Sequence, residues 1–213
     1  MAKHKVDDHY STSKGLHLNY SIITDIIEPD SKVLDLGCGS GELLKMLKDE
    51  KNVFGRGIEI NENNVIKSIE KGLSIYQGDI DEGLKEYSDK SYDYVILNQT
   101  LQSTHRPDYV MQEMLRVGKK CVVSFPNFAY WRIRFQLFFI GKMPRSKVLP
   151  FEWYDTPNIH LLTFQNFKEY CAKRNIKILR EIFMTRAKRR NDIFHKLLSN
   201  FLAEEVMFVV SKS

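Results

Sequence analysis

Long hydrophobic runs are absent from this chain of 213 residues. Its most apolar stretch, Phe135 to Ile140, is six residues long and is interrupted by Gln136. A membrane-spanning helix needs about 20 apolar residues, so we do not expect a membrane protein. Residues 1–14 are polar and lack the apolar run of a secretory signal, which predicts a flexible tail ahead of a single domain over residues 15–213.

Cysteine is scarce, and the cysteines present lie far apart in the sequence, at Cys38, Cys121 and Cys171. An odd number of cysteines without metal-ligand spacing argues against a disulfide framework and predicts no metal site. We therefore expect a cytoplasmic protein. The net charge of +5 and the pI near 9.0 are mildly basic and do not by themselves indicate nucleic-acid binding.

What the sequence does contain is a regular alternation of strand and helix patterns up to residue 125. Apolar runs predict strands at residues 32–36, 53–59, 73–77, 92–97 and 121–125. Between them, helical patterns cover residues 42–49, 61–72 and 107–117, the last with Pro near its start and Gly after its end. This β-α rhythm predicts an α/β fold with a mostly parallel sheet and helices on both faces.

After Phe125 the alternation stops. Residues 126–160 are rich in aromatic side chains and in Arg and Lys, without a clean period, and we interpret them as an insertion over the carboxyl edge of the sheet. A helix at 164–174, a strand at 177–184, a basic helix-prone piece at 186–202 and a strand at 206–210 follow. The two late strands predict an antiparallel hairpin on one edge of a sheet of about seven strands.

A glycine-rich loop follows the first strand at Gly37, Gly39 and Gly41 and leads directly into a helix. Such a loop lets a ligand approach the backbone and presents free N–H groups at the helix start. Glu42 stands where a dinucleotide-binding fingerprint has its third glycine. Because a carboxylate there would repel a pyrophosphate, the sequence favours S-adenosylmethionine or S-adenosylhomocysteine over NAD.

Polar side chains follow successive strands, where the carboxyl edge of an open α/β sheet binds its ligands. We expect Glu59 to accept hydrogen bonds from both ribose hydroxyls and Asp79 to accept one from the adenine amino group. Asp35 is predicted to face the ligand's ammonium group, and Asn98 its methionine moiety. The predicted cofactor-binding residues are therefore Asp35, Gly37, Gly39, Gly41, Glu59, Asp79 and Asn98, with Ile60 and Ile80 flanking the adenine ring.

Several motifs together resemble a known family. They are the glycine loop, Gly57-Ile-Glu-Ile, Gln77-Gly-Asp-Ile, Ser124-Phe-Pro-Asn-Phe, Trp131-Arg-Ile-Arg and Trp153-Tyr-Asp-Thr-Pro-Asn-Ile-His. The chain resembles the class I S-adenosylmethionine methyltransferases and, over roughly residues 22–210, the MetW family of methionine biosynthesis. This resemblance implies a Rossmann-like class I methyltransferase fold and a partnership with MetX, the homoserine O-acyltransferase. It does not imply that the chain itself transfers a methyl group.

No catalytic residue can be assigned from the sequence. The chain has Asn98-Gln99-Thr100-Leu101 where amine-directed methyltransferases carry an Asn/Asp-Pro-Pro-Tyr motif. Candidates for a general base are His105, His160 and Tyr154. The chain also lacks a Gly-x-Ser-x-Gly elbow, so in homoserine acylation the nucleophile would have to come from the partner.

The composition of the insertion leaves three roles open: a lid over the sheet, a protein interface, or a platform for single-stranded nucleic acid. The family resemblance favours the interface, and we do not expect a nucleic-acid partner. The alternative function is a free-standing methyltransferase acting on a small molecule, and an RNA-binding methyltransferase is a weaker third. The predicted contact residues are Phe128, Trp131, Arg132, Arg134, Trp153, Tyr154 and His160.

Overall fold

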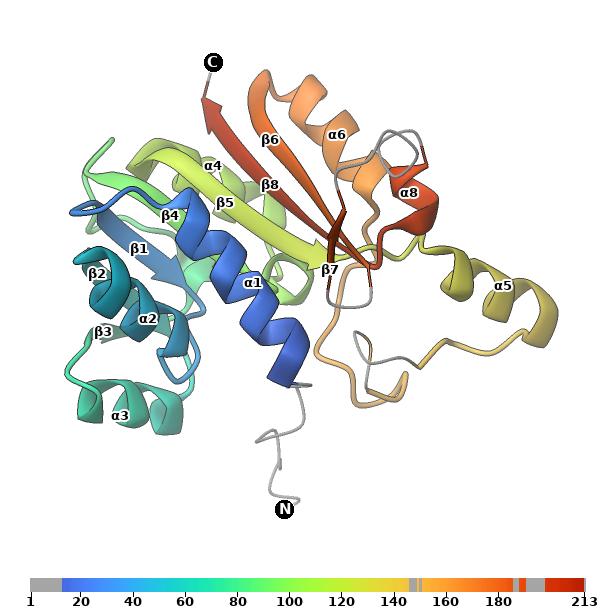
Figure 1. Ribbon diagram of the computed structural model, residues 1–213, viewed down its shortest axis with the longest axis horizontal. Coiled ribbons are helices and arrows are strands. Elements are labelled where there is room, and N and C mark those ends of the chain that lie inside the picture. The colour runs from blue at the N-terminus through green and yellow to red at the C-terminus, as the bar shows by residue number, and fades with distance from the viewer. Residues whose placement is uncertain (1–12, 146–148, 150, 186–187, 191–197, 213) are drawn as a thin grey trace.

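The computed structural model describes residues 13–145, 149, 151–185, 188–190 and 198–212 (Figure 1). Most of the predicted tail over residues 1–14 lies outside the described residues, as does the greater part of the basic, helix-prone piece predicted over residues 186–202. Of that piece, residues 188–190 form a strand, so the helix prediction is wrong there, whereas residues 199–202 are helical.

An eight-stranded sheet forms the centre of the fold, in the order β3-β2-β1-β4-β5-β8-β6-β7. The first five strands are parallel, whereas β8 runs antiparallel to both β5 and β6. The predicted α/β class and the antiparallel late pair are confirmed, with β8 inserted between β5 and β6 and the short β7 at the edge. The strands are β1 (Lys32–Leu36), β2 (Phe54–Glu59), β3 (Ser74–Gln77), β4 (Tyr92–Asn98), β5 (Gly118–Pro126), β6 (Ile176–Thr185), β7 (Lys188–Arg190) and β8 (Glu205–Lys212).

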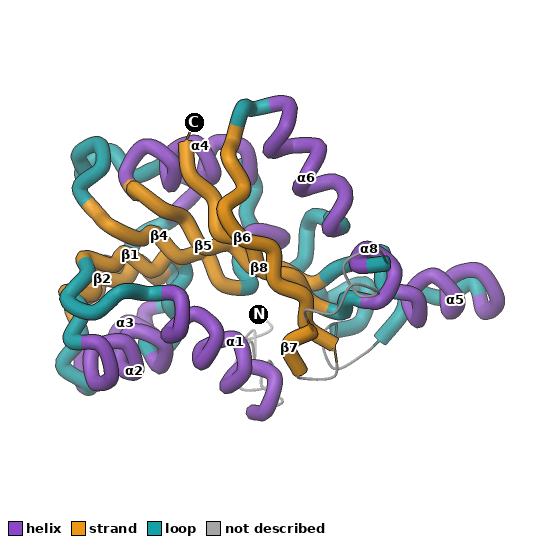
Figure 2. The backbone as a smooth tube through the Cα atoms, turned by 45° about the horizontal axis from the view of Figure 1, so that its top comes forward, coloured by secondary structure: helices purple, strands orange, loops and turns teal. Residues whose placement is uncertain are grey.

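Helices cover both faces of this sheet. Figure 2 shows α1, α2 and α3 on one side and α4 and α6 on the other. Asn61 caps α3 as its sequence position predicts, with its side chain accepting a hydrogen bond from the N–H of Asn64, and Pro107 opens α4. The helical elements are α1 (Ser13–Ile26), α2 (Glu42–Lys51), α3 (Glu62–Glu70), η1 (Ile80–Glu82), η2 (Leu101–Ser103), α4 (Pro107–Val117), α5 (Trp131–Ile140), α6 (Phe164–Lys173) and α8 (Ser199–Leu202).

Two helices, α1 and α5, were not predicted from the sequence. Helix α1 begins at Ser13, inside the segment predicted to be a tail, and it buries Ile22 and Ile23 against the sheet. Helix α5 lies in the insertion and buries only Ile133 among its ten residues. Its apolar residues occur on all sides, so its sequence has no amphipathic period that could have revealed a helix.

The hydrophobic core has two halves, one on each face of the sheet. Leu34 and Leu36 of β1 pack in the half that includes α4 and α6, and Val33 packs in the half that includes α1 and α2. Because successive residues of a strand point to opposite faces, Asp35 points toward the α1 side. The Asp35 carboxyl group, only 2% exposed, is therefore placed in the apolar layer beneath α1.

If α1 is an integral part of the domain, Ile23→Ala should lower the free energy of unfolding by about 2–5 kcal/mol, since this side chain is fully buried. Urea denaturation monitored by circular dichroism measures the change. The matched control is Ile66→Ala on α3, where the side chain is 48% exposed and a change of about 0.5 kcal/mol or less is expected. Equal losses in the two variants would contradict the packing of α1.

Candidate functional site

The loop between β1 and α2 needs its glycines for two different reasons. Gly37, Gly39 and Gly41 all have positive φ angles, of 70°, 55° and 79°. A Cβ at Gly37 would lie 2.8 Å from Thr100 Cγ2, and a Cβ at Gly41 would lie 2.5 Å from Leu73 Cδ1. At Gly39 a Cβ would meet nothing within 4 Å, so this glycine faces open space rather than protein. The loop is thus packed tightly at both ends and open at its middle.

Glu59, at the end of β2, holds this loop in place. The N–H of Gly39 donates to Glu59 Oε2 and the N–H of Asn61 donates to Glu59 Oε1, both at 2.8 Å. The side chain is 8% exposed. The anchoring role of Glu59 was not predicted from the sequence, which indicated contact with the ribose hydroxyls. Each carboxylate oxygen can accept a further hydrogen bond, so the two roles are compatible.

Asp35 is a buried acid whose pKa is affected by the charge of Glu59. Burial, and after it the nearby negative charge of Glu59, together raise the pKa of Asp35 to about 7. Helix α1 adds Tyr20, whose pKa is raised first by burial and then by the charges of Asp35 and Glu42. Tyr20 was missed because α1 was missed. The isoleucine spacing at Ile22, Ile23, Ile26 and Ile27 is the helical signal that could have found it.

The predicted adenine-binding residues lie where β2 and β3 end side by side. The N–H of Gly78 donates to the carbonyl of Glu59 at 3.1 Å, which joins the two strand ends. Asp79 caps η1 by accepting a hydrogen bond from the N–H of Asp81 at 2.8 Å. Ile60 is 64% exposed, and Ile80 is partly buried against the core. The aspartate therefore already has a structural partner, while Ile60 is free to contact a ligand.

Asn98 ends β4, and its amide group is turned toward β5. Its Oδ1 accepts a hydrogen bond from Ser124 Oγ at 2.6 Å, and its backbone carbonyl accepts one from Thr100 Oγ1. The next residue, Gln99, has a positive φ of 55° and donates its backbone N–H to the Ser124 carbonyl. The turn after β4 is thus fastened to β5, which fixes the position of the side chains at this part of the edge.

The candidate general bases do not meet at one place. His105 is exposed, in a loop whose backbone N–H donates to Asp81 at 2.8 Å. Tyr154 is 71% exposed. The backbone N–H of His160 donates to the carbonyl of Gln102 at 3.0 Å, and its Nε2 is buried without a hydrogen bond to any residue that the structure describes. His160 alone of the three is thus held near the turn after β4.

The predicted contact residues of the insertion fall into two groups. Phe128 and Trp131 are partly buried against the small cluster of Tyr130, Ile133 and Leu149. The other group is exposed, with Trp153 and Tyr154 at 73% and 71% exposure and their rings in edge-on contact at 5.6 Å.

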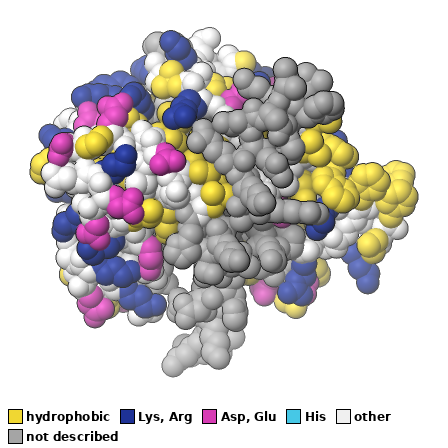
Figure 3. All heavy atoms as spheres, viewed as in Figure 1, with side chains coloured by type: hydrophobic (Ala, Val, Ile, Leu, Met, Phe, Trp, Pro, Cys, Tyr) yellow, Lys and Arg dark blue, Asp and Glu magenta, His cyan; other side chains and the backbone are white. Residues whose placement is uncertain are grey.

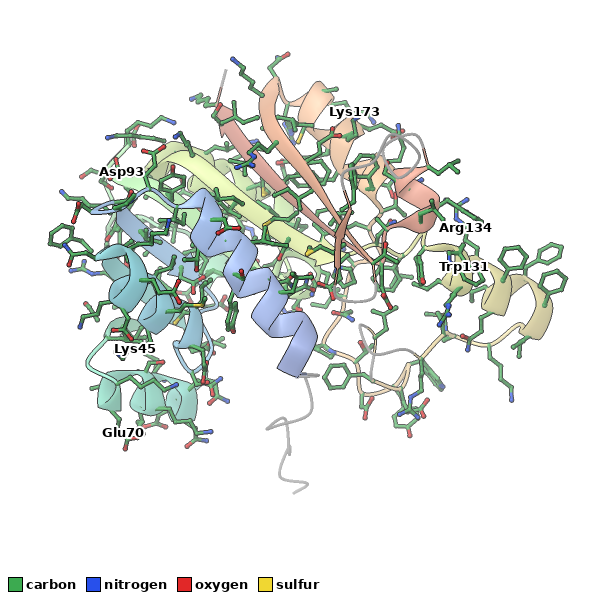
Figure 4. The ribbon with its side chains drawn as sticks, viewed as in Figure 1. Lys45, Glu70, Asp93, Trp131, Arg134 and Lys173 are labelled. Carbon is green, nitrogen blue, oxygen red and sulfur yellow. The ribbon has the colours of Figure 1, made fainter. Side chains whose placement is uncertain are left out.

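The two predicted contact arginines also differ in how available their side chains are to another molecule. The guanidinium of Arg132 lies 5.2 Å from the centre of the Trp131 ring. Arg134 is turned back into the protein, where it donates to the carbonyl of Ala129 and lies over the ring of Phe201 (Figure 4). Arg132 is therefore better placed than Arg134 for contact with another molecule.

Helix α5 carries an apolar surface that the sequence analysis did not single out. Figure 1 shows α5 projecting away from the sheet, and Figure 3 shows hydrophobic side chains gathered over it. Phe138 is 82% exposed and Phe139 is 69% exposed, and the ring of Phe139 stacks on that of Phe135 at 5.5 Å. We call Phe135, Phe138, Phe139 and Ile140 the α5 ridge.

Comparison with known proteins identifies the family. The family described as "Methionine biosynthesis protein MetW" matches residues 17–210. The chain belongs to the MetW family. A curated relative from Rhodopirellula baltica, "Bifunctional methionine biosynthesis protein MetXA/MetW", is 34% identical over 177 residues. The match covers 79% of this chain and 28% of the relative, so this MetW chain spans about a quarter of the relative's length. The predicted family is confirmed.

Solved structures confirm the fold. A SAM-dependent methyltransferase from Archaeoglobus fulgidus superposes with a TM-score of 0.66 at 19% identity, covering 94% of this chain and 95% of that one. The [4+2]-cyclase SpnF superposes with a TM-score of 0.66 at 14% identity, covering 97% and 85%. At these identities the likeness establishes the class I methyltransferase fold and nothing about the reaction.

Within the described parts of the chain, no helix is long and apolar enough to cross a membrane. The same residues contain no group of His, Cys, Asp and Glu side chains arranged to hold a metal ion.

The tight packing at the end of the glycine loop can be tested by mutation. Gly41→Ala should cost about 1–2 kcal/mol for its positive φ and about 1–3 kcal/mol more for the collision with Leu73. Gly72→Ala is the matched control, because Gly72 has a φ of +73° and open space around it. Only the conformational cost is expected there. Equal losses in urea denaturation would contradict the tight packing at Gly41.

Proposed function

We propose that this MetW-family chain acts in methionine biosynthesis as the partner or activator of the homoserine O-acyltransferase MetX. The observation that carries the proposal is the relative whose printed name joins MetXA and MetW in one chain. Two parts joined in one chain are held together at high effective concentration, which favours a working contact between them. Parts found on separate chains need a binding surface to reach the same arrangement.

The structure offers such a surface in α5 and in the exposed pair Trp153 and Tyr154. Helix α5 buries one residue of its ten, and the α5 ridge leaves large apolar side chains in water. Burying apolar surface stabilises a complex by about 25 cal/mol per Å² before the costs of association. Aromatic residues and arginine are also the types that most often dominate the energy of protein interfaces, and Arg132 lies against Trp131 here.

The cofactor part of the proposal is that the glycine loop binds S-adenosylmethionine or S-adenosylhomocysteine. Support comes from the open space at Gly39 and from the buried acids Asp35 and Glu59, which form no ion pair with a described residue. Both ligands carry an ammonium group, and S-adenosylmethionine carries a sulfonium group as well, so either one supplies positive charge to these acids. Glu42, beside the loop, accepts a hydrogen bond from Ser40 and pairs with Lys71 at 2.9 Å. These contacts hold its carboxylate beside the loop, where it would repel the pyrophosphate of a dinucleotide.

Binding of such a ligand would give the partnership with MetX a regulatory role. S-adenosylmethionine is made from methionine, so its binding would report the state of the pathway to the acyltransferase. The alternative is a free-standing methyltransferase acting on a small molecule, which the class I fold also supports. Purified MetX assayed with and without this chain distinguishes them: a partner raises its turnover, whereas an enzyme consumes S-adenosylmethionine with a metabolite when alone.

The interface can be tested at Trp153. Trp153→Ala should weaken association with MetX by at least about 10-fold, because truncating a central interface aromatic commonly costs 2 kcal/mol or more. Binding of S-adenosylhomocysteine should stay within about 3-fold. Both affinities are measured by calorimetry. Phe54→Ala is the matched control, since Phe54 is an aromatic of 65% exposure at the opposite end of the sheet.

A lid would give the reverse pattern, with weaker ligand binding and unchanged association. That result would overturn the interface proposal while leaving the cofactor proposal intact. Because Trp153 is 73% exposed, the variant should fold normally.

The cofactor proposal can be tested at Glu59. Glu59→Ala should weaken binding of S-adenosylhomocysteine by about 10- to 150-fold, since the variant loses charge-assisted hydrogen bonds to the ribose and the anchor of Gly39. Glu70→Ala, an exposed carboxylate on α3, should leave the affinity unchanged. NAD should not bind measurably to the unmodified chain. Unchanged affinity in a folded Glu59→Ala variant would contradict the placement of the nucleoside.

A further inference from the structure

A third acid, Glu205, lies half-buried at the carboxyl edge of the sheet, on the other side of β4 from the glycine loop. Glu205 is the first residue of β8 and stands opposite Pro126 of β5 and Met184 of β6. Because β8 runs antiparallel, its beginning lies at the edge where β5 and β6 end. The sequence analysis placed no function here.

Three segments distant in the sequence meet at this carboxylate. Asn19 of α1 donates its Nδ2 to Glu205 Oε2 at 2.9 Å, and Gln99, in the turn after β4, donates its Nε2 to the same oxygen at 3.3 Å. Oε1, the second oxygen of Glu205, accepts no hydrogen bond from a residue that the structure describes. The carboxylate is thus oriented from one side and has free acceptor capacity on the other.

Among the residues that the structure describes, no positively charged group is paired with Glu205. Asn19 and Gln99 are neutral, and the charged group that acts on Glu205 is its chain neighbour Glu204. The pKa of Glu205 is raised to about 7, mainly by desolvation and also by the charge of Glu204, against the lowering effect of the hydrogen bond from Asn19. A partly desolvated carboxylate that no cation pairs with is unfavourable, so a cationic ligand is the natural complement.

Neighbouring amide groups point to the same kind of ligand. The Oδ1 of Asn19 is buried without a hydrogen-bond partner, and so is the Oε1 of Gln102; these side chains are 3% and 0% exposed. The amide orientations follow from their donors, because Asn19 Nδ2 donates to Glu205 and Gln102 Nε2 donates to the Gln99 carbonyl at 2.7 Å. The unsatisfied atoms are therefore all acceptors. An ammonium group, with three N–H donors and no acceptor, matches them.

We propose that Glu205, Asn19 and Gln99 form a subsite for the ammonium group of a small primary amine. Asn98, the residue predicted to lie beside the methionine moiety, directly precedes Gln99 in the chain, so the amine would bind next to the cofactor. The inference goes beyond the proposed function and does not depend on it. It concerns the binding of a second small ligand by this chain alone, and its failure would leave the partnership with MetX untouched.

The direct test is a titration of the full chain by NMR with n-propylammonium, and separately with 1-propanol, which has the same size without the charge. Both titrations are run with and without S-adenosylhomocysteine. We expect the ammonium probe to bind at least about 10-fold more tightly than the alcohol. Equal binding of the two probes to the unmodified chain would overturn the proposal.

Two variants assign the effect to the residue. Glu205→Gln keeps an oxygen for Asn19 but removes the charge, and it should reduce affinity for n-propylammonium by about 10-fold, to the level of 1-propanol. Glu204→Gln is the matched control one residue away, and its affinity should stay within about 3-fold. If Glu205→Gln binds the ammonium probe as tightly as the unmodified chain, the assignment to Glu205 is wrong.

A stability measurement checks the charge state independently of any ligand. Because the folded-state pKa of Glu205 is raised from 4.5 to about 7, this group makes folding less favourable as pH rises through that window. Glu205→Gln removes the effect, so its stability advantage over the unmodified chain should grow from pH 4.5 to about pH 7 and then level off. Asp35 titrates in both proteins and cancels in the difference. A pH-independent difference in urea denaturation would show that Glu205 is not a desolvated titrating carboxyl.

Discussion

The carboxylate of Glu59 is the contact on which the rest of the site depends. It accepts one hydrogen bond from the loop that follows β1 and one from the turn that follows β2, so it fixes these two chain segments relative to each other. The loop has three residues in the left-handed region, which only glycine adopts without strain, and such a loop has little rigidity of its own. A charge-assisted hydrogen bond from Gly39 supplies that rigidity. The open side of the loop can then hold one shape before any ligand arrives.

Three acids share the carboxyl edge of the sheet, Asp35, Glu59 and Glu205, and none of them forms an ion pair with a residue that the structure describes. Asp35 and Glu205 both have pKa values raised to about 7, mainly by desolvation, and Glu59 contributes to the shift of Asp35. Each of these carboxyl groups makes folding less favourable in its charged form. A bound cation would stabilise the charged form and so offset that loss of stability. These acids are thus compatible with the two ligands proposed for this edge, a sulfonium ligand and an amine beside it.

Whether a feature could be predicted from the sequence depends on how far apart along the chain its interacting residues lie. The strands, the α3 cap at Asn61 and the glycine loop were predicted because each depends on neighbours within a few residues. The contact between Asn19 and Glu205 joins residues 186 positions apart, and in the sequence Glu205 reads as an ordinary charged residue ahead of a strand. Helix α5 escaped detection for a different reason: a helix with apolar residues on every side has no period to recognise. Both failures concern features whose role comes from tertiary structure or from a second molecule.

The fold and the glycine loop cannot by themselves explain what is particular to this family. A methyltransferase and a [4+2]-cyclase superpose on this chain equally well, so the shared sheet and its ligand edge are compatible with different chemistries. What is particular must lie where the common β-α rhythm is interrupted. That is the segment between β5 and α6, which contributes α5, the exposed pair Trp153 and Tyr154, and the His160 backbone contact to Gln102. This segment touches the turn after β4 at one end and presents the α5 ridge at the other, so it connects the carboxyl edge of the sheet to an exposed apolar surface.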